Sequence, residues 1–143
     1  MELEELSQEQ LEQIDSILDH RLLTLGVNDV ILLDTAGNVV TTREGSHRVL
    51  NDSEAPSVDP FTLSALAAGN FSTTEAIAQA IGETEFDLLF HKGRHLCVHY
   101  GKIANALILV TIFSSEIALG SVRLNVQSAT NEILMILKQP KQS

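Results

Sequence analysis

The chain has 143 residues, of which 44% are hydrophobic, and its formal net charge is −10. This length suits one domain with a buried core, and the hydrophobic fraction argues against disorder. The acidic balance argues against nucleic acid and anionic membrane surfaces as partners. There is no signal-peptide pattern, no apolar run near the ~20 residues of a membrane-spanning helix, and only one cysteine, so we expect a cytoplasmic protein.

The first predicted elements are a helix and a hairpin. Ser7 and Gln10 fit a capping box, and apolar residues follow at helical spacing until Gly26. The apolar run 30–33 and the segment 39–43 flank turn residues 34–38, which predicts one buried strand and one edge strand. Residues 44–58 are polar and rich in turn formers, so we expect a flexible loop there.

The second predicted helix runs from Asp59, which can cap it, to Gly82, which suits its left-handed end. One of its sides carries larger residues that we expect to pack on the core: Leu63, Leu66, Asn70, Ile77 and Ile81. The opposite side has no charged residue, and apart from one phenylalanine its residues are small: Phe61, Ala65, Ala68, Ser72 and Ala76. Another part of the chain could cover this small stripe, but its smoothness favours close approach by another protein.

Three strands and a final helix complete the predicted order. The strands span 86–91, 95–100 and 106–113, and Ser114 or Ser115 is expected to cap the helix. Residues 138–143 form a polar tail that we expect to fray. The fold class is therefore α/β: a single domain over residues 1–143, an α-β-β-α-β-β-β-α sandwich around a five-stranded antiparallel sheet whose last strand is central.

Two groups of residues raise the question of chemistry. Asp34-Thr35-Ala36-Gly37 matches the metal-binding aspartate motif of small GTPases, but no Gly-rich phosphate loop accompanies it, so we interpret it as a hairpin turn. His95, Cys97 and His99 alternate along one strand and could reach a zinc ion. A solvated turn and a buried thiol explain the same residues. No catalytic constellation is present, so we expect a protein that is not an enzyme and holds no cofactor or metal.

Several segments resemble the Roadblock family, the dynein-light-chain type of domain, in its bacterial MglB-like branch. They are Val30 to Val40, Leu66 to Ala76, Ile81-Gly82-Glu83, and Phe113 with Leu119 to Leu124. The resemblance runs from about Leu6 to Leu137 and implies the fold predicted above. It also implies a homodimer in which the second helices pair and the third strands join two sheets into one.

The resemblance further implies a partner and an activity. The partner is a small Ras-like GTPase, MglA-like in bacteria, that sets cell polarity or motility. The dimer speeds GTP hydrolysis without inserting an arginine, by placing the GTPase's own groups. The family's GTPase contact lies along the second helix and carries over to Ala68, Ser72 and Ala76, with Ala65 on the same stripe. Roadblock domains also serve as scaffolds that tether a complex, and that alternative stays open. So does a third, a small-ligand or metal sensor that uses the face of His95, Cys97 and His99.

Overall fold

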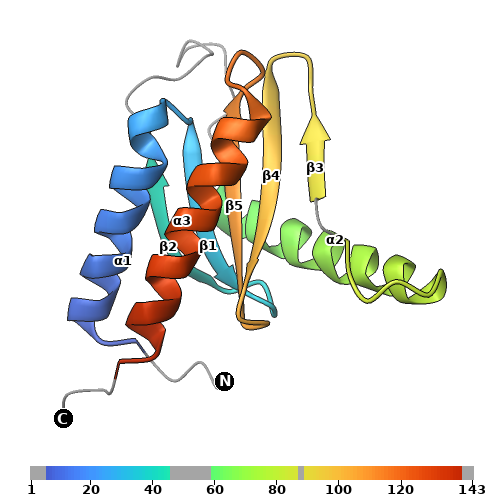
Figure 1. The fold of residues 1–143 in the computed structure, drawn as a ribbon, viewed down its shortest axis with the longest axis horizontal. Helices are drawn as coiled ribbons and strands as arrows, with labels where there is room; N and C mark the ends of the chain where they lie inside the picture. The colour runs from blue at the N-terminus through green and yellow to red at the C-terminus, as the bar shows by residue number, and fades with distance from the viewer. Residues whose placement is uncertain (1–5, 46–58, 87–88, 140–143) are drawn as a thin grey trace.

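The computed structural model describes residues 6–45, 59–86 and 89–139, and these form three layers (Figure 1). Helices α1 and α3 cover one face of a five-stranded sheet, and helix α2 crosses the other face. The elements are α1 (Gln8–Arg21), a 3-10 turn η1 (Leu23–Leu25), β1 (Asp29–Asp34), β2 (Val39–Glu44), α2 (Pro60–Ala80), β3 (Leu89–Lys92), β4 (Leu96–Ile103), β5 (Leu107–Ser114) and α3 (Leu119–Leu137). The predicted α/β sandwich is confirmed.

The sheet has the strand order β2-β1-β5-β4-β3, and each neighbouring pair is antiparallel. Every residue of β5 is buried, which confirms the prediction that the last strand is central and covered on both faces. The predicted strand 86–91 is shorter in the structure: β3 begins at Leu89, Phe86 lies outside it, and residues 87–88 lie outside the described residues.

The ends of the predicted segments differ in detail. Strand β2 extends through Glu44, so only residues 45–58 can belong to the predicted loop, and 46–58 lie outside the described residues. In the predicted tail, Lys138 and Gln139 continue directly from α3, while 140–143 lie outside the described residues. None of the helices within the described ranges has both the length and the hydropathy needed to cross a bilayer.

Helices α1 and α3 pack their large apolar residues on the sheet, as their spacing predicts. Ser7 and Gln10 form the expected capping box, with Ser7 Oγ accepting from the Gln10 amide at 3.1 Å. The predicted Ser114 or Ser115 cap of α3 is wrong, because β5 continues through Ser114 and a turn separates it from the helix. The N-cap is Ala118, which makes no side-chain hydrogen bond.

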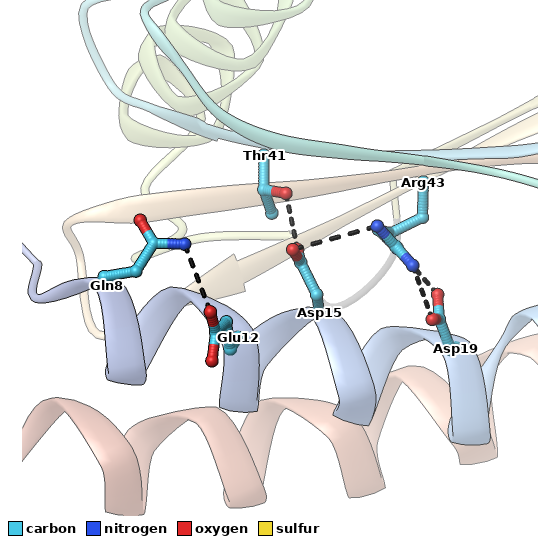
Figure 2. Close-up of polar contacts among 6 residues, drawn as sticks. All are labelled: Gln8, Glu12, Asp15, Asp19, Thr41 and Arg43. Atoms are coloured by element: carbon cyan, nitrogen blue, oxygen red, sulfur yellow. Dashed lines mark hydrogen bonds and ion pairs between the residues drawn. The ribbon is translucent and has the colours of Figure 1, made fainter.

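Two aspartates of α1 accept hydrogen bonds from side chains of the edge strand β2 (Figure 2). Asp15 Oδ1 accepts a hydrogen bond from Thr41 Oγ1 at 2.5 Å. The Arg43 guanidinium donates to both carboxylate oxygens of Asp19, at 2.7 and 2.6 Å. These Asp19 hydrogen bonds raise the pKa of Arg43.

Candidate interaction surface on helix α2

Helix α2 begins and ends as the sequence predicts. Asp59 Oδ1 accepts from the Phe61 amide at 3.0 Å, its other carboxylate oxygen accepts from Thr62 Oγ1 at 2.6 Å, and Pro60 occupies the first turn. These two hydrogen bonds, Thr62 first, lower the pKa of Asp59. Gly82 follows the helix at φ 85°, where a left-handed residue is needed.

The face of α2 that rests on the sheet, here called the sheet face, is made of small residues. Ser64, Ala67 and Ala68 are buried on it, and Leu63 and Phe71 are partly buried beside them. They pack on a second apolar cluster, formed on this side of the sheet by β1, β4 and β5. The partly buried Leu63 matches the prediction for that residue.

Close approach between α2 and the β1–β2 turn explains why the sheet face is small. Gly37 lies in this turn at φ 94°, and a Cβ atom there would stand 3.4 Å from Ala65 Cα and 3.6 Å from Ala68 Cβ. Side chains larger than alanine at Ala68 would push the helix away from the turn.

Three large side chains expected on the core lie at the surface instead. Leu66 is 66% exposed, Ile77 is 51% exposed and Ile81 is 67% exposed, so that part of the prediction is wrong. We call these three residues the apolar flank. The reason is geometric: the small residues of the sheet face make the close packing, and the C-terminal half of α2 extends past the edge of the sheet (Figure 1).

The other exposed side of α2 carries Ala65, Ser72 and Ala76, which we call the small flank. Ala68, predicted to belong to the same partner-facing stripe, is only 7% exposed and belongs to the sheet face. The predicted stripe is therefore divided: Phe61 and the three residues of the small flank are exposed, whereas Ala68 packs against the sheet.

The single charge of α2 is directed at the sheet edge. Glu75 Oε2 accepts from Lys102 Nζ of β4 at 3.0 Å, and the same ammonium lies 5.9 Å from the centre of the Phe71 ring. Because this pair holds Glu75 toward β4, the two exposed flanks of α2 carry no charged side chain. Neutral flanks cost little to desolvate, which suits contact with a protein surface.

The Asp34 motif is a hairpin turn, as interpreted. The Gly37 amide donates to the Asp34 carbonyl at 3.0 Å, and Asp34 Oδ1 accepts from the amides of Ala36 and Asn38. Burial raises the pKa of Asp34, but hydrogen bonds led by Asn38 outweigh it and lower the pKa overall. The carboxylate is committed to the turn, which leaves α2 as the candidate interaction surface.

His95, Cys97 and His99 do not come together as a metal site. His95 is exposed at the β3–β4 turn, Cys97 is buried in the core under α1 and α3, and His99 is buried further along the strand. Neighbouring His91 packs its ring edge-on against Tyr100 at 5.4 Å. Within the described ranges, no three His, Cys, Asp or Glu side chains gather around a point where a metal ion could bind.

No protein-family model and no curated protein matches the chain. Solved structures match it closely in three dimensions. A gliding protein MglB from Thermus thermophilus is 27% identical with a TM-score of 0.77, over 92% of this chain and 93% of that one. An MglB with a tetrameric arrangement is 26% identical with a TM-score of 0.78, over 92% of both chains. A Roadblock/LC7 domain from Streptomyces avermitilis shares the fold at 13% identity, with a TM-score of 0.67 over 85% of this chain and 98% of that one.

Proposed function

We propose that this chain, which has a Roadblock fold of the MglB-like kind, is a homodimeric regulator that binds a small Ras-like GTPase and stimulates its hydrolysis of GTP. The pathway we assign is cell polarity or motility, because the Thermus protein of the same fold is a gliding protein. The observation that carries the proposal is the pair of uncharged flanks that α2 leaves exposed.

The apolar flank supports pairing with a second copy of the chain. Seven large hydrophobic residues are exposed in the described part of the protein, and three of them form the apolar flank: Leu66, Ile77 and Ile81. Each Leu or Ile side chain removed from water contributes about 1.5–3 kcal/mol. A sister α2 laid along this flank would bury the same residues from both chains, as a twofold interface requires. The tetrameric arrangement of a similar MglB is consistent with an assembling fold.

The small flank supports contact with the GTPase. Ala65, Ser72 and Ala76 present little bulk, so a partner segment can approach the helix backbone closely. Because the small and apolar flanks lie on different sides of α2, a sister helix can occupy one while a GTPase occupies the other. This division of surfaces replaces the stripe that included Ala68.

The proposed stimulation depends on groups of the GTPase itself. From Pro60 to Ala80 the helix contains no arginine or lysine, so α2 offers no cationic finger for the γ-phosphate. A regulator of this kind accelerates hydrolysis by holding the partner's catalytic residues and attacking water in a productive arrangement.

The test is single-turnover GTP hydrolysis by an MglA-like GTPase from the same organism, with and without this protein. We expect acceleration by the wild type. We expect Ser72→Arg and Ala76→Arg to abolish it, because a long cation must then be buried against the partner. Asn131→Arg, an exposed position on α3, is the matched control and should retain the acceleration.

Two outcomes would contradict parts of the proposal. A folded wild-type protein that binds the GTPase equally well in its GDP and GTP states, without accelerating hydrolysis, would make it a scaffold. Full acceleration by both small-flank variants would remove that flank from the interface. Ala68→Arg is unsuitable for this test, because a charge at this buried position would disrupt packing on the sheet.

A further inference from the structure

A second surface feature lies away from the exposed flanks of α2, at the outer part of β4. A hollow of about 600 Å³ opens there between α2 and α3. On its α3 side it is lined by His99 and Gly101 of β4 and by Gly120, Arg123 and Gln127 of α3. This volume falls in the range that binds small molecules.

His99 is an unusual residue to find in the wall of an open hollow. It is 6% exposed, and its Nδ1 is buried without a hydrogen-bond partner. Burial, and then the charge of Arg123, lower its pKa to about 4, so the ring is neutral at pH 7. A buried polar atom without a partner costs free energy, so this one calls for an explanation.

Glycine at position 101 leaves room beside this histidine. A Cβ atom there would lie 3.0 Å from Val126 Cγ1 and 4.0 Å from His99 Cε1. A side chain would therefore either push α3 outward or fill the wall of the hollow beside the ring.

The α3 side of the hollow is electropositive. Arg123 is exposed, and no carboxylate in the described ranges pairs with it. It projects from the second turn of α3, a helix whose first turn has neither an acidic residue nor a side-chain cap. The free amides at this end carry partial positive charge, and a Cβ added to Gly120 would meet open space.

The acidic residues of the hollow lie on the α2 side of β4. Successive side chains of a strand point to opposite faces, so Lys102 points to the face opposite His99 and Gly101. Lys102 Nζ is 3.0 Å from Glu75 and 3.9 Å from Glu85, which holds both carboxylates near that ammonium. Among the residues that the structure describes, Arg123 therefore forms no ion pair with a carboxylate.

Apolar side chains stand beside this cationic region. Leu124, next to Arg123, and Phe86 are both exposed, and both line the hollow. A ligand that contacted both would need an anionic end and an apolar body. Arginine favours carboxylates and phosphates through paired donors, and the apolar rim selects an organic acid from among these anions.

We propose that the α3 side of this hollow binds a small organic carboxylate, with the acid group at Arg123 and the first turn of α3 and the apolar body between Leu124 and Phe86. His99 forms the neutral floor, and Gln127 lines the same side of the hollow. This site goes beyond the regulation of a GTPase and does not rest on it.

The experiment is a titration of the ¹⁵N-labelled full chain with hexanoate, with hexanol as the uncharged match of the same length. We expect hexanoate to shift the amides of Gly101 and Gly120 saturably, with one ligand per chain. Hexanol should bind at least about tenfold more weakly, because it lacks the charge-assisted contacts. Arg123→Gln should reduce hexanoate affinity by about tenfold or more. Arg94→Gln, an exposed arginine on the β3–β4 turn, should leave it unchanged.

A second variant tests the apolar end separately. Leu124→Ser should weaken hexanoate binding several-fold and leave acetate binding unchanged, because acetate is too short to reach that rim. The proposal is overturned if hexanoate causes no saturable shift up to about 10 mM, if hexanol binds equally well, or if Arg123→Gln binds like the wild type. Inorganic phosphate binding more tightly than hexanoate would also overturn it.

Discussion

The two faces of the sheet are covered in opposite ways. On one face, α1 and α3 bury large side chains such as Leu18 and Ile133 completely. On the other face, α2 rests on alanine and serine and leaves Leu66 and Ile77 exposed. The first arrangement holds the domain together, whereas the second leaves large apolar side chains of the helix exposed to solvent.

This difference shows that an apolar stripe at helical spacing does not by itself identify what the stripe contacts. In α1 and α3 the apolar stripe is the side of the helix that packs on the sheet. In α2 the close approach of the Gly37 turn selects small residues for the sheet, so the larger ones lie to one side.

The largest expected effect is the difference in the free energy of unfolding between two leucine-to-alanine variants, one in each layer of helices. Leu18→Ala should lower the free energy of unfolding by about 3 kcal/mol, because it leaves a cavity under α1. Leu66→Ala should cost less than about 0.5 kcal/mol in the isolated chain, because the side chain is already in water. Chemical denaturation followed by circular dichroism measures both values.

The costs of the two substitutions should depend differently on protein concentration. If Leu66 lies in a dimer interface, the cost of Leu66→Ala grows as the concentration of protein is raised, whereas the cost of Leu18→Ala does not. Equal costs for the two substitutions at every concentration would contradict the distinction between the two faces.

A smaller effect concerns pH and the buried histidine on the α3 face. The pKa of His99 is about 4 in the folded chain and 6.5 ordinarily. Above pH 6.5 the ring is neutral in both states, and its contribution to stability is fully present. Between pH 6.5 and 4 only the unfolded chain takes up the proton, so stability falls as the pH falls. We expect a loss of roughly 2 kcal/mol, less than the full shift would give because the ring lies beside an open hollow.

His99→Gln is the variant that isolates this contribution. Its free energy of unfolding should vary less between pH 6.5 and 4 than that of the wild type, because glutamine does not titrate. His95→Gln, at an exposed position, should retain the wild-type profile. Identical profiles for wild type and His99→Gln would show that the histidine is not desolvated in the folded chain.

The smallest expected effect concerns the polar link between α1 and β2. Arg43→Gln should cost about 1 kcal/mol or less, because both partners of the Arg43–Asp19 pair are about one third exposed. The cost should shrink further in high salt. A cost as large as that of Leu18→Ala would mean that the α1 layer depends on its ion pairs more than on its buried side chains.

The sequence predicts the fold well because its local signals agree with the tertiary structure. The caps of α1 and α2, the turn at Asp34 to Asn38 and the apolar run of β5 are all found where the sequence predicts them, whereas the predicted serine cap of α3 is not. The β4–β5 turn is less visible: Ala104 and Asn105 adopt φ of 55° and 59°, and alanine is not a residue that signals a left-handed turn.

The surface of α2 is predicted less well, and Ala68 shows why. Composition indicates that the helix has a small side and a large side, but which side meets the sheet depends on how closely Gly37 approaches. That distance is set by strands remote in sequence. Arg123 and His99 are likewise separated by a turn and a strand, so no local spacing indicates that they share a hollow.

The central claim is that α2 exposes its apolar flank to receive a second copy of the chain. Sedimentation equilibrium of the wild type and of the Leu66→Glu/Ile77→Glu double variant, with Met135→Glu on α3 as the matched control, tests it most directly. We predict a mass of twice 15.6 kDa for the wild type and for Met135→Glu, and 15.6 kDa for a folded double variant. A monomeric wild type, or a double variant that stays dimeric, would contradict the claim.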